Sequence, residues 1–215
     1  MYEMTEIFLD HENAAKHDFQ GIAPLSPTPE TMTPTLLVYT KLSYTHETHY
    51  LTTEQVNELF LFTAEAHTTR KPLNRFITIH MKDLKEKTAQ ACLSNVMEKT
   101  RKWLQRNGYE HAYIWTLENG PVKGIHAHIL IHIPSRYMTA YKRLLAKWLP
   151  FEMTEGTLDC KTVKYPPYGA LGGRSCVYGA LRYMCKGIDP ATPLHLIKPE
   201  YQGEIIGRRC GWSKL

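Results

Sequence analysis

Cysteine is scarce in this sequence, and its spacing excludes several kinds of structure. The 215 residues contain five cysteines, and no two of them form a C-x-x-C pair. A disulfide-stapled secreted fold or a cysteine zinc site needs paired or regularly spaced cysteines. An odd, scattered set indicates reduced thiols, and we therefore expect a cytoplasmic protein.

Long apolar runs and a strong charge excess are also missing. No stretch approaches the ~20 apolar residues of a membrane helix, and the first residues lack the basic and apolar regions of a signal peptide. We therefore expect no membrane partner. The formal net charge is only +5, which permits an anionic partner such as nucleic acid but does not require one.

The most informative stretch is the run from Gly124 to Pro134. Alternate residues are apolar on one side, and the other side carries His126, His128, Leu130 and His132. This period of two, in a run rich in β-branched residues, predicts a strand with one face in the core. His126 and His128 are one pleat repeat apart, so both rings can reach one divalent metal ion. His132 lies about 13 Å beyond His128 along a strand, too far to join them.

The remaining pattern predicts an α+β fold. Helices are expected near 53–66, 84–106, 135–148 and 177–186, the first with a capping box at Thr52–Gln55 and the third capped by Ser135. Strands are expected at 76–80, 111–117, 157–164 and 205–206. A proline-punctuated leader, residues 1–35, precedes a single domain, residues 36–215. The element order predicts a central antiparallel sheet with helices packed mainly on one face, in the ferredoxin-like or RRM-like style.

Two further features suggest chemistry. A catalytic metal needs about three protein ligands and an open position, and Glu118, in the turn before the histidine strand, is the best oxygen ligand for Mg²⁺ or Mn²⁺; a solvated turn carboxylate is the competing interpretation. Tyr183 and Lys186 share a helix face at i, i+3, where an ammonium favours a phenolate nucleophile; a packed tyrosine beside an exposed lysine is the ordinary interpretation. Tyr178 points about 140° away from Tyr183 and lacks a lysine at i+3.

The strand with His126-Ala127-His128, followed downstream by Tyr183-x-x-Lys186, resembles the HUH endonucleases, and more narrowly the single-tyrosine initiators of rolling-circle plasmids and phages. The resemblance spans about residues 70–190; residues 76–79 are similar to the family's first motif, and Glu118 to its acidic third ligand. Ala127 is small where the family favours a bulkier apolar residue. The resemblance implies an HUH fold in which His126, His128 and Glu118 hold Mg²⁺ or Mn²⁺.

The resemblance also implies a reaction and partners. Tyr183 would attack a phosphate in single-stranded or hairpin origin DNA and form a 5′-phosphotyrosine, with Lys186 assisting and Tyr178 as the alternative nucleophile. The chain lacks a G-x-x-x-x-G-K-[ST] loop, so a separate helicase and polymerase are expected, in the cytoplasm of a host cell. The candidate DNA contacts are basic residues, taken as a set: Arg70, Lys71, Arg75, Arg174, Arg208 and Arg209.

Three alternatives stay open. A single-tyrosine transposase or a relaxase would use the same HUH chemistry with different partners. A histidine-triad nucleotide hydrolase would need a third histidine where this chain has Leu130. A non-catalytic RRM-like nucleic-acid-binding module would display aromatic residues on its exposed sheet face, where this strand has histidines instead.

Overall fold

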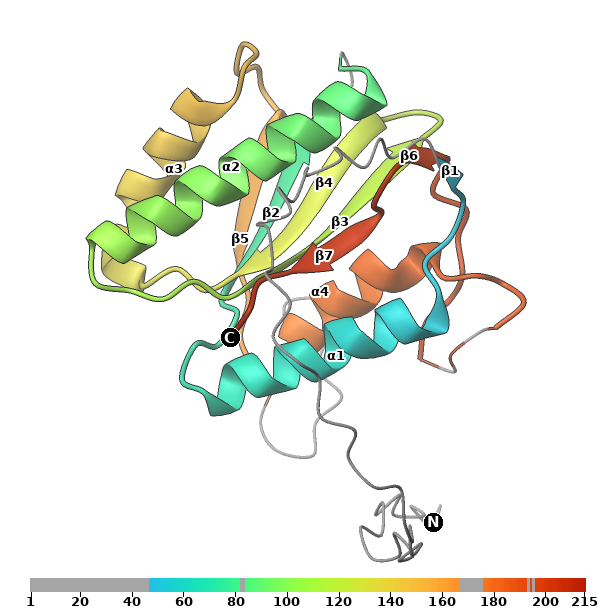
Figure 1. Ribbon diagram of the computed structural model, residues 1–215, viewed down its shortest axis with the longest axis horizontal. Coiled ribbons are helices and arrows are strands. Elements are labelled where there is room, and N and C mark those ends of the chain that lie inside the picture. Colours follow the sequence, from blue (N-terminus) through green and yellow to red (C-terminus); the bar gives the residue numbers. More distant parts are fainter. Residues whose placement is uncertain (1–46, 82–83, 167–175, 193, 195) are drawn as a thin grey trace, which may run out of the picture. The chain divides into compact units, whose positions relative to one another are not determined.

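The computed structural model describes residues 47–81, 84–166, 176–192, 194 and 196–215 (Figure 1). The chain divides after Lys41, and all described residues belong to the second unit, Leu42–Leu215. The predicted leader, residues 1–35, and Arg174 lie outside the described residues. No helix of the described part has the length and apolar character needed to cross a membrane.

One antiparallel sheet of five strands forms the centre of this unit, in the order β5-β2-β4-β3-β7. The strands are β2 (Arg75–His80), β3 (Tyr113–Gly120), β4 (Gly124–Ile131), β5 (Leu158–Thr162) and β7 (Cys210–Trp212). A separate two-stranded sheet pairs β1 (Glu47–Thr48) with β6 (Ile205–Ile206). The predicted histidine strand is therefore β4, in the middle of the large sheet.

Four of these strands and two helices form a ferredoxin-like unit. The chain order is β2, α2 (Glu86–Arg106), β3, β4, α3 (Met138–Trp148) and β5, which is the β-α-β-β-α-β motif. This confirms the predicted α+β fold with a central antiparallel sheet. The short strand β7, which the sequence pattern did not predict, extends the sheet beyond β3.

The helices cover both faces of the sheet, so the expectation that they lie mainly on one face is wrong. The helices α2 and α3 pack on one face, and α1 (Thr53–Thr68) and α4 (Val177–Met184) pack on the other (Figure 1). Strand β4 requires this arrangement because almost every one of its residues is buried. Ala127 and Ile129 face the first layer, while Leu130 faces the second.

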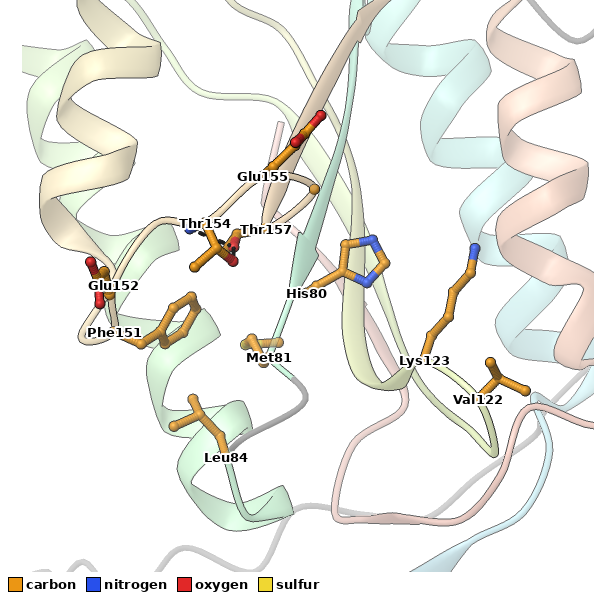
Figure 2. Close-up of a pocket in the computed structure, with 11 residues that line it drawn as sticks. His80, Met81, Leu84, Val122, Lys123, Phe151, Glu152, Thr154, Glu155 and Thr157 are labelled. Carbon is orange, nitrogen blue, oxygen red and sulfur yellow. Dashed lines mark hydrogen bonds between the residues drawn. The ribbon is translucent and has the colours of Figure 1, made fainter.

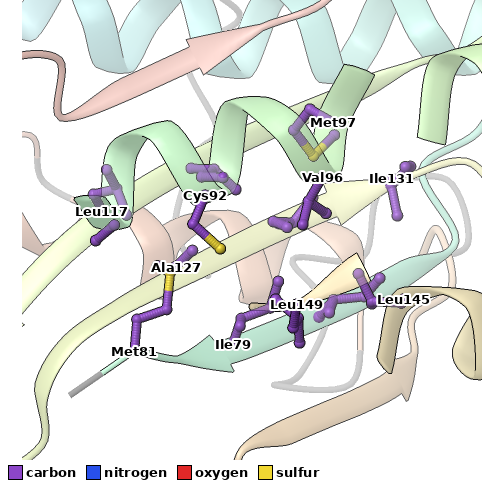
Figure 3. Packing of buried hydrophobic residues seen from close by; sticks show 14 of the residues in the cluster. Ile79, Met81, Cys92, Val96, Met97, Leu117, Ala127, Ile131, Leu145 and Leu149 are labelled. Carbon is purple, nitrogen blue, oxygen red and sulfur yellow. The ribbon is translucent and has the colours of Figure 1, made fainter. Parts of the chain in front are cut away.

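The core between the sheet and α2 is built from interlocking aliphatic side chains (Figure 3). Val96 and Met97 of α2 meet Ile79 of β2 and Ala127 of β4, and Leu145 of α3 closes the layer. Each fully buried side chain of this size contributes about 1.5–3 kcal/mol. This layer holds β2 and β4 rigidly side by side, which fixes the positions of the polar residues on their opposite face.

The helix ends follow the sequence with one exception. The Thr52 hydroxyl accepts a hydrogen bond from the Gln55 main-chain N–H (3.2 Å), and the Gln55 side chain accepts one from the Thr52 main-chain N–H (3.0 Å), which confirms the predicted capping box. Ser135 makes no capping bond, because the chain enters α3 through a 3₁₀ turn, η1 (Ser135–Tyr137), that begins after Pro134. The last predicted helix is α4, continued by a second 3₁₀ turn, η2 (Cys185–Gly187).

Candidate metal centre

Three potential metal ligands meet on the face of the sheet that α1 and α4 cover. Glu118 of β3 pairs directly with His126 of β4, and His128 lies one pleat repeat further along β4. The Glu118 Oε2 atom is 3.0 Å from His126 Nε2 and 3.5 Å from His128 Nε2. All three side chains are buried, and within the described part of the chain no other group of three such ligands meets within 4.8 Å.

Glu118 belongs to the strand and not to a turn. Strand β3 continues to Gly120, and only three residues connect it to β4. The predicted turn at Glu118 was therefore placed too early. The correction strengthens the site, because a residue inside the strand has a fixed register and its carboxylate stands beside the ring of the opposite residue.

The two imidazoles are held by bonds to their other nitrogen. His126 Nδ1 lies 3.0 Å from the Gly124 carbonyl, which can only accept, so Nδ1 carries the hydrogen and Nε2 is the ligand atom. His128 Nδ1 lies 3.0 Å from the Thr78 hydroxyl on β2. Such contacts orient the rings of metal-bound histidines and set their tautomer.

Two polar atoms of the cluster have no hydrogen-bond partner. They are Glu118 Oε1 and His128 Nε2, and both are buried. A buried polar atom without a partner costs about 1–3 kcal/mol, so a cation at this point would relieve the cost. Two ligands held about 2.1 Å from one ion at right angles are about 3.0 Å apart. The observed separations of 3.0 and 3.5 Å therefore fit a divalent ion.

The protonation states suit metal binding. Burial raises the pKa of Glu118, but hydrogen bonds from His126 and His128 outweigh burial and bring this pKa to about 2. Burial lowers the pKa of His128, against the opposing effect of the Glu118 carboxylate. At neutral pH, Glu118 is thus ionised and His128 is neutral, which are the forms that bind metals.

Tyr183 and Lys186 lie against this cluster. The Tyr183 ring meets the His128 ring edge-on, with 5.1 Å between centroids, and its side chain is 42% exposed. The Lys186 Nζ atom lies 4.1 Å from the Tyr183 ring centroid and 3.4 Å from Glu118 Oε2. Burial lowers the pKa of Lys186, but Glu118 and Tyr183 raise it by more, so it is a firm ammonium. Tyr178 instead packs edge-on against Tyr165 in the core beneath α1.

The predicted DNA contacts separate into buried and exposed residues. Arg75 and Arg209 are buried, so the prediction that they contact DNA phosphates from the surface is wrong. The Arg75 guanidinium donates to the Asn74 carbonyl (2.7 Å), and that of Arg209 donates to the Thr48 carbonyl (2.6 Å). Both side chains tie segments of the fold together.

The other basic residues remain candidates. Arg70 and Arg208 are exposed, and Lys71 is partly buried and forms an ion pair with Glu110. Their role in DNA binding stays a prediction.

Sequence reasoning missed two residues next to the cluster, Thr78 and His80. Both are on β2, where they pair with His128 and His126 respectively. The His80 ring stacks on the His126 ring, with 5.4 Å between centroids and 23° between planes. The strand itself was predicted, but its register against β4 was not, and a shift of one residue would turn both side chains to the other face.

Fold and site together define an α+β protein with a candidate divalent-metal centre bordered by an accessible tyrosine and a lysine. Residues 74–187 match the family of the replication-associated protein ORF2. This is more than half of the 215 residues, and the chain therefore belongs to that family. The match confirms the resemblance to rolling-circle replication initiators, and its span includes Glu118, both histidines, Tyr183 and Lys186. No curated protein and no solved structure matches the chain.

Proposed function

We propose that this protein is a metal-dependent, site-specific endonuclease and strand transferase that acts on single-stranded DNA and initiates rolling-circle replication. The observation that carries the proposal is the position of Tyr183. Its half-exposed ring lies beside His128, a candidate metal ligand, and under the ammonium of Lys186. Membership of a replication-associated family supports the biological context.

His126, His128 and Glu118 would hold the ion. A bound divalent ion, Mg²⁺ or Mn²⁺, supplies positive charge that polarises a phosphoryl oxygen. The sheet keeps the three ligands in place, and Thr78 and the Gly124 carbonyl orient the imidazoles. Burial of the cluster under α1 and α4 lowers the local dielectric and strengthens its electrostatic effect.

Tyr183 would be the nucleophile. A phenol has a pKa near 10 and needs activation, and the Lys186 ammonium at 4.1 Å from the ring favours the phenolate. The phenolate oxygen attacks phosphorus, the bond from phosphorus to the 3′ oxygen breaks, and the strand leaves with a free 3′-OH. A phosphodiester now joins Tyr183 to the 5′ end. Lys186 also stabilises the negative charge that develops on the phosphoryl group.

The covalent link preserves the energy needed for rejoining. A later attack by a 3′-OH on the phosphotyrosine restores a continuous strand and frees Tyr183. In the meantime a polymerase can extend the first 3′-OH. Because the chain has no nucleotide-binding loop of the G-x-x-x-x-G-K-[ST] type, we expect strand separation to come from another protein.

The test is formation of a covalent adduct with DNA. The protein is incubated with a pool of labelled single-stranded and hairpin oligonucleotides and Mn²⁺, and the products are separated on a denaturing gel. We expect an adduct that disappears with EDTA and in Tyr183→Phe, but persists in the matched variant Tyr178→Phe. An adduct in Tyr183→Phe that is lost in Tyr178→Phe would transfer the nucleophile to Tyr178. Binding without any adduct would favour a non-catalytic RRM-like module.

A further inference from the structure

A cavity of about 520 Å³ opens next to the candidate metal centre (Figure 2). It is lined by the end of β2, by the turn between β3 and β4, and by residues 151–157, which lead into β5. His80 forms the wall nearest to the centre, since its ring stacks on His126. One aromatic ring therefore separates the cavity from a candidate metal ligand.

The walls of the cavity are suited to a flat, apolar object. Met81, Leu84 and Phe151 supply apolar surface, and Figure 2 shows the rings of Phe151 and His80 on opposite sides of Met81. Phe151 is only partly buried, although it packs on the main core. Aromatic side chains of this kind stack on unpaired bases, which pack about equally well whatever their sequence.

The charges around the cavity exclude a phosphate from its interior and favour a neutral ligand with N–H groups. The carboxylates of Glu152 and Glu155 line one side, and the Lys123 ammonium stands on the other side beside His80 (Figure 2). Carboxylates repel a phosphate but accept hydrogen bonds from the exocyclic amino groups of bases. Lys123 can contact the phosphate backbone at the rim.

We propose that this cavity binds one unpaired base of the DNA strand, from a nucleotide within one or two positions of the scissile phosphate. The inference rests on the proposed function and adds a point of sequence recognition to it. Stacked nucleotides are about 3.4 Å apart along one strand, and more when extended. The 5.4 Å between the His80 and His126 rings therefore spans only one or two nucleotides. The carboxylates favour adenine, cytosine or guanine over thymine.

The experiment crosses a protein variant with a missing base. Abasic sites are placed one at a time along the oligonucleotide that forms the adduct or, if none does, the one bound most tightly. Binding is measured by fluorescence anisotropy in EDTA, so that no cleavage occurs. In the wild type, we expect an abasic site at one position to weaken binding roughly 5- to 150-fold, the range for losing one stacked base. In Phe151→Leu the same abasic site should have almost no effect, because the stacking partner is already gone.

Controls separate this proposal from its alternatives. Tyr201→Leu removes an exposed aromatic residue outside the cavity and should respond to the abasic sites like the wild type. Glu155→Gln should reduce the preference against thymine at the same position. Thermal melting verifies that each variant is folded. If Phe151→Leu and the wild type respond equally at every position, the cavity does not bind a base, even if the adduct forms. Absence of all DNA binding would overturn this inference and the proposed function together.

Discussion

Addition of Mn²⁺ to the metal-free protein should stabilise it measurably. Glu118 Oε1 and His128 Nε2 are buried without a partner, and three ligand atoms already meet within 4.8 Å. The ligand set is therefore built in the folded chain and is lost on unfolding. Any ion that binds only the folded state raises the free energy of unfolding by mass action.

The size of the effect follows from the affinity. At a free Mn²⁺ concentration 100 times the Kd, the free energy of unfolding rises by about 2.7 kcal/mol. For a domain of 150–250 residues, each kcal/mol raises Tm by about 2–4 °C. The expected increase in Tm is therefore roughly 5–11 °C.

The assay is thermal unfolding followed by circular dichroism, in EDTA and in Mn²⁺, with the Kd measured separately by calorimetry. Glu118→Gln keeps the size of the side chain but removes the anionic oxygen, and it should lose the Mn²⁺-induced shift. His132→Gln is the matched control, because His132 contacts the Pro72 carbonyl and lies outside the cluster; it should keep the shift. An equal shift in Glu118→Gln and the wild type, or none in the wild type at 100 times the Kd, would refute the reasoning.

Three further predictions concern the same framework. The pKa of Glu118 falls from 4.5 to about 2 on folding, so its contribution of up to about 3 kcal/mol is present above pH 4.5 and lost as the pH falls toward 2; urea unfolding in EDTA should show this loss in the wild type but not in Glu118→Gln. His126→Ala combined with His128→Ala should abolish Mn²⁺-dependent cleavage of DNA, and undiminished cleavage would remove the cluster from the mechanism. Gly203→Ala should destabilise by well over 2 kcal/mol in urea unfolding, since φ is +71° and the new Cβ would lie 1.7 Å from a β3 carbonyl oxygen. Gly108→Ala, with φ +76° and open space, should cost only about 1–2 kcal/mol, and equal losses would contradict this account.

Local pattern was sufficient for the secondary structure around the site. The alternation in 124–134 predicted β4, and the capping box predicted the start of α1, because both depend on residues a few positions apart. The boundaries were less accurate. Glu118 was assigned to a turn, since an Asn-Gly-Pro sequence follows it, but pairing with β4 extends the strand through Gly120.

Burial was harder to predict than periodicity. Arginines are mostly exposed in proteins, so Arg75 and Arg209 were assigned to the DNA-binding surface. The fold buries both, because main-chain carbonyls satisfy part of each guanidinium, and in Arg209 that carbonyl comes from a distant segment. Such partners are brought together only when the segments pack, and no local sequence pattern reports them.

The amino-acid sequence alone determined the α+β class, the pair of histidines on one strand, and the spacing of Tyr183 and Lys186 on one helix face. These features follow from the repeat of a single strand or helix. Only the tertiary structure decided that α4 lies over the histidine face, which brings Tyr183 to His128 and Lys186 to Glu118. It also decided the register of β2, which places Thr78 and His80 beside the histidines. Both depend on how the apolar faces of separate elements pack, and that free energy is summed over contacts far apart in the chain.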